Sequence, residues 1–217
     1  MAVLTDVVIA APAKKPQGAK KPAPAPAPAR QPNIVQLAFR LYLKNLQKRP
    51  LVTKALTSAT ISLLAELLSQ RLLGRRGVDW RRAALLAAYG LVWSGPTNHF
   101  WQGKLEKIFP NQKDSLRPAK KTLLDQLTFG PVQNVLFLTY LSSVVDRAPA
   151  GVTLDRLRVA VPAAQVRGWK FWPAVQLLNQ AFVPPQFRVL WINGFAFVWG
   201  LSMILANKPG AKKAVKA

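Results

Sequence analysis

Residues 187–206 read FRVLWINGFAFVWGLSMILA and contain no charged side chain after Arg188. A helix needs about 20 residues to cross the roughly 30 Å hydrocarbon core of a bilayer. The stretch therefore predicts a transmembrane helix over about 186–206. A chain with one such helix is expected to be an integral membrane protein, so weaker apolar stretches elsewhere in it become candidate spans.

Three further apolar stretches have similar lengths but contain polar residues. They cover about 51–72, 82–101 and 120–144, and Pro50 stands at a helix-start position before the first of them. Polar positions suit transmembrane helices that shield one another in a bundle. The sequence therefore predicts an all-α fold, an integral membrane bundle of four transmembrane helices within residues 33–208.

The segments around this bundle are basic. Residues 33–49 predict an amphipathic helix on the membrane surface, because apolar side chains follow Ile34 at helical spacing and basic ones recur every fourth residue from Arg40 to Lys48. Residues 1–32 form a Pro/Ala/Lys tail expected to be disordered, and 209–217 form a second basic tail. We expect these tails to contact anionic lipid.

The charge balance indicates the kind of partner. The chain has 31 Lys and Arg against 8 acidic residues, a formal charge of +23 that suits either nucleic acid or an anionic membrane. A nucleic-acid binder would interleave aromatic residues with a basic stripe, whereas here the aromatics lie in or beside apolar runs. The expected partner is therefore the lipid bilayer and not nucleic acid.

The residue types needed for catalysis are scarce. The chain has no cysteine and a single histidine, His99, so a thiolate site or a two-histidine metal site is excluded. No phosphate-binding glycine loop or serine elbow occurs either. We therefore expect no catalytic residue, no metal, no cofactor and no enzyme activity.

Residues 154–185 lie between the last two spans. The first part predicts a basic loop helix, and the part from Trp169 onward, aromatic but too short to span, predicts an interfacial or re-entrant segment. Aromatic residues near the predicted span ends suggest a membrane-interface belt. These are Trp80, Trp101, Tyr140, Trp169 and Trp172.

Lys and Arg counts suggest an orientation. With four spans, both tails and the 102–121 region share one side. The region before the first span holds nine basic residues, the 102–121 region holds six, and the region after the last span holds four. The opposite side holds five in 71–82 and five in 147–170. This bias predicts that both termini face the cytosol.

Polar residues recur along the first span every fourth residue, which places them on one helical stripe. They are Lys54, Ser58, Ser62, Glu66 and Gln70. A carboxylate costs roughly 2.5–3.5 kcal/mol at mid-membrane, so Glu66 should face protein or water. The stripe is either one wall of a hydrated pathway or a close-packing surface with Glu66 paired to a neighbouring Arg.

The third span shows a second polar face. Gln126, Gln133 and Tyr140 repeat at seven residues, and Asp125 and Asn134 lie one residue beside them. Both a pore lining and an interhelical hydrogen-bond ladder produce this pattern. Asp125 alternatively pairs with Lys121 one turn earlier.

The second span contains Gly95-Pro96, which predicts a kink because proline removes a backbone hydrogen bond. Asn98 and His99 follow it. His99 is interpreted either as a proton relay or as a structural, hydrogen-bonded histidine. In the fourth span, Arg188 is expected to snorkel or to pair with a carboxylate.

Three strings resemble the 22-kilodalton peroxisomal membrane protein family, which also has mitochondrial inner-membrane members. They are GPTNHFW (95–101), KTLLDQLTFGP (121–131) and WKFWPAVQLLNQAFVPPQFR (169–188), and RPLVTKALTSATISLLAELLSQRL (49–72) is most similar to the peroxisomal branch. The resemblance covers about 40–208. Its marks include Gly95, Pro96, Trp101, Pro131, Trp169, Trp172, Pro173, Gln176, Asn179, Pro184 and Arg188. Gln102 and Gln180 depart from it, because the family usually has aromatic residues there.

The resemblance implies four spans, cytosolic termini, insertion after synthesis by a peroxisomal import receptor, and a channel for small solutes linked to reactive-oxygen metabolism. The pore would be lined by polar candidates from three spans. These are Ser62, Glu66, Gln70, Asn98, His99, Asp125, Gln126, Gln133 and Asn134. A mitochondrial inner-membrane address, a non-conducting structural role and a homo-oligomer with its pore between subunits stay open as alternatives.

Overall fold

The computed structural model describes residues 33–206, and every regular element within them is a helix. The predictions of a disordered tail over 1–32, of a basic tail over 209–217 and of their contact with anionic lipid lie outside the described residues. The all-α fold class is confirmed for the part of the chain that the structure describes.

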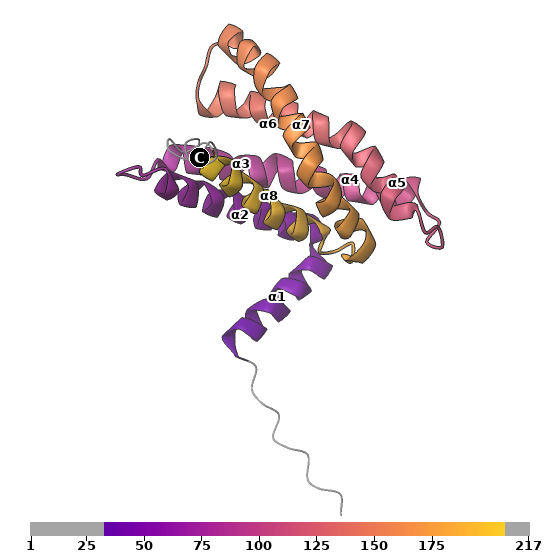
Figure 1. Cartoon of the computed structure of the whole chain (residues 1–217). Coiled ribbons are helices and arrows are strands. Elements are labelled where there is room, and N and C mark those ends of the chain that lie inside the picture. The colour runs from indigo at the N-terminus through magenta and orange to yellow at the C-terminus, as the bar shows by residue number, and fades with distance from the viewer. Residues whose placement is uncertain (1–32, 207–217) are drawn as a thin grey trace, which may run out of the picture.

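The predicted amphipathic helix is present as α1, Ile34–Lys48. Asn33 begins it with a capping box, in which its side chain accepts from the Gln36 amide at 2.8 Å and the Gln36 side chain accepts from the Asn33 amide at 3.1 Å. The basic face from Arg40 to Lys48 is exposed, while Leu46 is buried and α1 packs on α2. Figure 1 shows α1 projecting away from the other helices.

The centre of one half of the fold is α2, Pro50–Leu72, which begins at Pro50 as predicted. It packs against α3 (Trp80–Tyr89), η1 (Gly90–Ser94), α4 (Gly95–Ile108) and α8 (Arg188–Ala206). These helices run side by side in Figure 1.

The contact between α2 and the second helical segment is backbone on backbone. A Cβ atom added at Gly95 would lie 2.6 Å from the Cα of Ala55, and one at Gly90 would lie 2.8 Å from the carbonyl oxygen of Ser58. Only glycine permits so close an approach. Gly90 and Gly95 therefore set the separation of α2 from its neighbour.

The second and third helical segments are each interrupted by a π turn just before a Gly-Pro pair. η1 precedes Gly95-Pro96, and η2 (Asp125–Phe129) separates α5 (Arg117–Leu124) from α6 (Gly130–Tyr140), which begins with Gly130-Pro131. Proline lacks an amide hydrogen and crowds the preceding turn, and a wider turn accommodates both effects. The irregularity predicted at Gly95-Pro96 thus takes the form of a π turn. A third π turn, η3 (Leu141–Val145), ends the segment.

The division predicted within residues 154–185 is wrong. Instead of a loop helix followed by a separate interfacial or re-entrant segment, the structure has one 33-residue helix, α7 (Ala150–Phe182), with Pro162 and Pro173 inside it. At 1.5 Å per residue such a helix is about 50 Å long. It packs on α5, α6 and α8, and these tertiary contacts hold the helix through both prolines, which the sequence pattern treated as breaks. Figure 1 shows α7 crossing the other helices. The interfacial position of the part from Trp169 onward stays a prediction.

The four predicted spans coincide with helical segments, but two of them are longer than predicted. Helix continues over 80–108 instead of 82–101, and over 117–145 instead of 120–144. Among the described helices, Pro50–Leu72 is long and apolar enough to cross a bilayer, and Arg188–Leu201 is a shorter apolar helix. The π turns divide the second and third segments into shorter α-helical pieces.

Burial in the described part of the chain is inverted relative to a soluble protein. Apart from glycines, its buried residues comprise 17 polar or charged ones and 8 apolar ones. Large apolar side chains lie outside instead; Val92, Val159 and Phe182 are 73%, 76% and 78% exposed. In water this surface would be costly, whereas in lipid it is the favourable arrangement.

Candidate functional site

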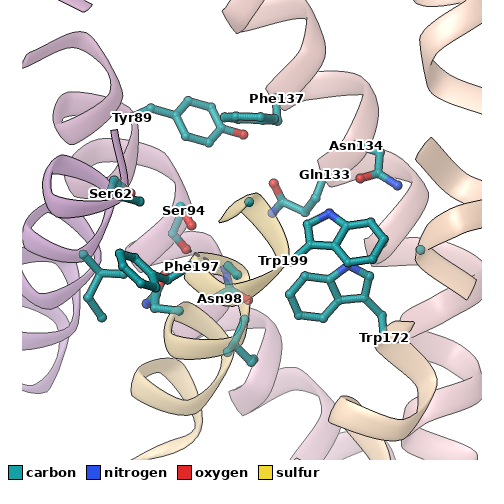
Figure 2. Close-up of a pocket in the computed structure, with 18 of the residues that line it drawn as sticks. Ser62, Tyr89, Ser94, Asn98, Gln133, Asn134, Phe137, Trp172, Phe197 and Trp199 are labelled. Carbon is teal, nitrogen blue, oxygen red and sulfur yellow. Dashed lines mark hydrogen bonds between the residues drawn. The ribbon is translucent and has the colours of Figure 1, made fainter. Parts of the chain in front are cut away.

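A cavity of about 410 Å³ lies between α2, the second and third helical segments, α7 and α8. We call it the central cavity. Figure 2 shows Ser62 of α2, Asn98 of α4 and Gln133 of α6 placed around the same space. Seven of the nine candidate residues line it. They are Ser62, Glu66, Asn98, Asp125, Gln126, Gln133 and Asn134.

Gln70 and His99 do not line the cavity. The Gln70 side chain donates to Glu66 at 2.9 Å and accepts from the Asp79 amide at 2.8 Å, so it fastens the turn between α2 and α3. The Nδ1 atom of His99 lies 3.2 Å from Nζ of Lys54. This contact favours the structural interpretation of His99.

The polar stripe on α2 faces protein, as its spacing predicted. Lys54, Ser58, Glu66 and Gln70 are buried and Ser62 is half-buried. Glu66 lines the cavity and is also paired with Arg82, whose Nε lies 3.0 Å from its Oε1. The stripe therefore has features of both alternatives: part of it lines a cavity, and Glu66 is paired with a neighbouring Arg.

Asp125 is the centre of a buried hydrogen-bond network. It accepts from Nε1 of Trp101 at 2.7 Å, from Nε2 of Gln176 at 2.9 Å and from Nε2 of Gln126 at 3.1 Å. The predicted alternative, a pair with Lys121, is wrong, because both residues find partners on α4: Lys121 donates to Glu106 at 2.6 Å. Asp125, Gln126 and Gln176 of this network line the central cavity.

The polar face of α6 combines a cavity lining with interhelical hydrogen bonds. The Gln133 side chain accepts from Nε1 of Trp93 at 3.0 Å and donates to Thr97 at 3.1 Å. Asn134 donates to Gln165 of α7 at 2.8 Å. These side chains join the third helical segment to the second one and to α7 while also lining the cavity.

Three of the five residues in the predicted aromatic belt have contacts inside the bundle, and the belt itself stays a prediction. Trp101 bonds to Asp125, the Tyr140 hydroxyl donates to the Leu85 carbonyl at 2.8 Å, and Trp172 lines the central cavity beside Trp199. Each ring carries a polar atom that finds a partner or a polar space inside the bundle. Trp80 and Trp169 are exposed as the belt requires.

A second polar cluster, missed by sequence reasoning, surrounds Glu106. Its carboxylate accepts from Arg117, Lys121 and Arg188, and we call these four residues the basic cluster. Burial alone would raise the pKa of Glu106, but hydrogen bonds from Lys121 and Arg188 lower it to about 2. The prediction that Arg188 pairs with a carboxylate is confirmed. The sequence did contain a signal for this cluster: because acidic residues are scarce, each carboxylate is expected to pair with several basic side chains.

Two of the resemblance residues on α7, Trp172 and Gln176, line the central cavity. Gln176 bonds to Asp125, and buried Asn179 donates to Gln176 at 3.1 Å. Trp169 Nε1 donates to the Gln126 carbonyl at 3.4 Å. Pro184 follows Val183, where α7 ends.

The two departures from the resemblance contact each other. Nε2 of Gln180 donates to Oε1 of Gln102 at 2.9 Å, and both side chains are buried. A hydrogen bond between α7 and α4 therefore stands where the resemblance leads one to expect aromatic residues.

An apolar exterior around a polar, partly open interior defines the class of helical membrane proteins. A family model described as the Mpv17 / PMP22 family matches residues 143–203. The chain is 36% identical over 176 residues to peroxisomal membrane protein PMP22 of Arabidopsis thaliana, covering 81% of this chain and 93% of that protein. The chain belongs to the Mpv17/PMP22 family.

Relatives come from two organelles. The chain is 30% identical over 169 residues to peroxisomal membrane protein 2 of Bos taurus, covering 75% of this chain and 85% of that protein. It is 26% identical over 161 residues to mitochondrial inner membrane protein Mpv17 of Caenorhabditis briggsae, covering 74% and 88%. No solved structure matches the chain.

Proposed function

We propose that this protein is a non-enzymatic channel of the peroxisomal membrane that lets small polar solutes diffuse through its helical bundle. The observation that carries the proposal is the central cavity, where seven polar candidates from three helical segments meet inside an apolar exterior. Its volume of about 410 Å³ falls in the range of small-molecule sites, roughly 300–1,000 Å³.

The same proposal includes four transmembrane spans over about 51–72, 82–101, 120–144 and 186–206, with both termini in the cytosol. The relatives named as peroxisomal membrane proteins support a peroxisomal address. Insertion through a peroxisomal import receptor is a further part of the proposal. The mitochondrial relative supports the inner mitochondrial membrane as the alternative address.

The test is solute flux through the purified full-length chain in liposomes, with a matched pair of variants on α8. A Cβ atom at either Gly194 or Gly200 meets nothing within 4 Å, but only Gly200 lines the central cavity. Gly200→Leu should fill the cavity and lower the flux of small polar solutes, while Gly194→Leu should leave it unchanged. Absence of flux at high protein load, or equal loss in both variants, would remove the proposal.

One observation favours a second candidate, a non-conducting structural protein. Several polar side chains that line the cavity bond across helices: Asn193 accepts from Ser58 at 2.8 Å and Asn134 donates to Gln165 at 2.8 Å. Such bonds alone would hold a bundle together. This candidate predicts intact folding and no flux for the unmodified chain.

A further inference from the structure

The basic cluster lies at the end of the bundle where α4, α5 and α8 meet, and none of its four residues lines the central cavity. Its charges are unbalanced. Three cations share the one carboxylate of Glu106, which leaves an excess of two positive charges. The side chains of Lys121 and Arg188 are only 1% and 5% exposed.

Buried cations in this proportion need more compensation than one carboxylate gives. Removing a charge from water costs several kcal/mol unless partners replace the water. Lys121 has three N–H donors and the structure gives it one carboxylate acceptor. An additional anion would supply the missing negative charge and the missing acceptors.

Unpartnered polar atoms occur on two of the helices that carry the basic cluster and near the end of α7. In the part of the chain that the structure describes, five buried side-chain atoms lack a hydrogen-bond partner, and four of them belong to Gln102, Thr122, Asn179 and Gln180. Gln102 lies one turn before Glu106 on α4, and Thr122 follows Lys121 on α5. Nε2 of Gln102 and the Thr122 hydroxyl are donors that an anion can satisfy, whereas the side-chain oxygens of Asn179 and Gln180 are acceptors that it cannot.

The end of α7 joins this region to Arg188. The Val183 carbonyl accepts from Nε of Arg188 at 3.1 Å, and the Val183 amide donates to the Asn179 carbonyl. Gln180, one residue after Asn179, bonds to Gln102. The two donors without partners lie on helices that carry the basic cluster: Nε2 of Gln102 is on α4, and the Thr122 hydroxyl is on α5.

We propose that the basic cluster binds a phosphate-type oxyanion, from either a free phosphate or a phospholipid headgroup. Two guanidinium groups and an ammonium group offer the charge-assisted donors that a tetrahedral oxyanion accepts. Glu106 is 30% and Arg117 17% exposed, so an anion reaches the cluster from outside the bundle. The inference does not depend on whether the protein conducts solutes.

The test uses the full chain in phosphatidylcholine nanodiscs, titrated with inorganic phosphate at constant ionic strength and followed by calorimetry. Lys121→Gln should weaken binding about tenfold or more, since a charge-assisted hydrogen bond contributes roughly 1.5–3 kcal/mol. Lys107→Gln, which removes the same charge from an exposed position on α4, is the matched control and should bind like the unmodified chain.

Two variants separate binding from a purely structural clamp. Thr122→Val removes a hydroxyl that has no partner, so it should weaken phosphate binding without lowering the melting temperature. Glu106→Gln removes the competing carboxylate, so it should tighten phosphate binding even while it loosens the fold. A structural clamp predicts no effect of Thr122→Val on binding and no gain in Glu106→Gln.

A second arm replaces part of the phosphatidylcholine with phosphatidic acid. Saturable binding of inorganic phosphate identifies a free-phosphate site. Retention of phosphatidic acid that Lys121→Gln abolishes, without phosphate binding, identifies a headgroup site. Failure of both probes to bind, or equal weakening by Lys107→Gln and Lys121→Gln, would overturn the inference.

Discussion

At the scale of single residues, the carboxylate of Glu106 is the most connected group in the described chain that lies beyond the predicted spans. It holds Arg117, Lys121 and Arg188, and so connects α4 to α5 and α8. Its pKa of about 2 lies below the ordinary value of 4.5. A carboxyl whose pKa is lower in the folded state stabilises the fold while it is ionised.

We therefore predict an acid-dependent loss of stability that Glu106→Gln removes. The contribution of Glu106 is fully present above pH 4.5 and is lost as the pH falls toward about 2. Melting temperatures of the detergent-purified chain and of Glu106→Gln should differ most above pH 4.5 and converge below it. A constant difference across that interval would contradict the assignment.

The sequence located polar residues better than their partners. Asp125, Gln133 and Asn134 were found because they share a face of one predicted helix. Local spacing suggested Lys121 as the partner of Asp125, whereas the real donor Trp101 lies 24 residues away. Glu106 and Arg188 are 82 residues apart, a separation about which helical periodicity says nothing.

At the scale of elements, the approach of α4 to α2 depends on the absence of a side chain at Gly95. Gly95→Ala should destabilise the protein by about 1–3 kcal/mol, because its Cβ would lie 2.6 Å from Ala55 Cα, a backbone atom. Gly103→Ala on the same helix is the control, since nothing lies within 4 Å of its Cβ position and alanine favours helix. The comparison is a denaturation curve in mixed micelles. Equal stability of the two variants would contradict the close packing of α2 and α4.

Helix existence followed from the apolar stretches, but helix length did not. The ends of the second and third segments continue past the apolar residues because buried ion pairs and hydrogen bonds, such as those of Glu106, support polar turns. α7 was divided at the sequence level because its basic first half and its prolines hide a continuous helix. Its packing on three neighbouring elements is a tertiary property that no local pattern contains.

At the scale of the whole molecule, the proposed topology predicts which loops share a compartment. The chain has no cysteine, so single cysteines can be added without background labelling. In intact peroxisomes Ser115→Cys, in the 109–116 loop, should react with a membrane-impermeant thiol reagent added outside. Arg76→Cys, in the 73–79 loop, should react only after permeabilisation. The reverse pattern would invert the topology, and reaction of both in intact organelles would exclude four spans.

The central claim is that the polar interior of this bundle is open to water while its exterior faces lipid. Ser62 and Thr60 test it on one helix, because Ser62 lines the central cavity and Thr60 is exposed on the outside of α2. In reconstituted liposomes, Ser62→Cys should react with a small water-soluble methanethiosulfonate and Thr60→Cys should not. Reaction at Thr60→Cys with none at Ser62→Cys would contradict the account.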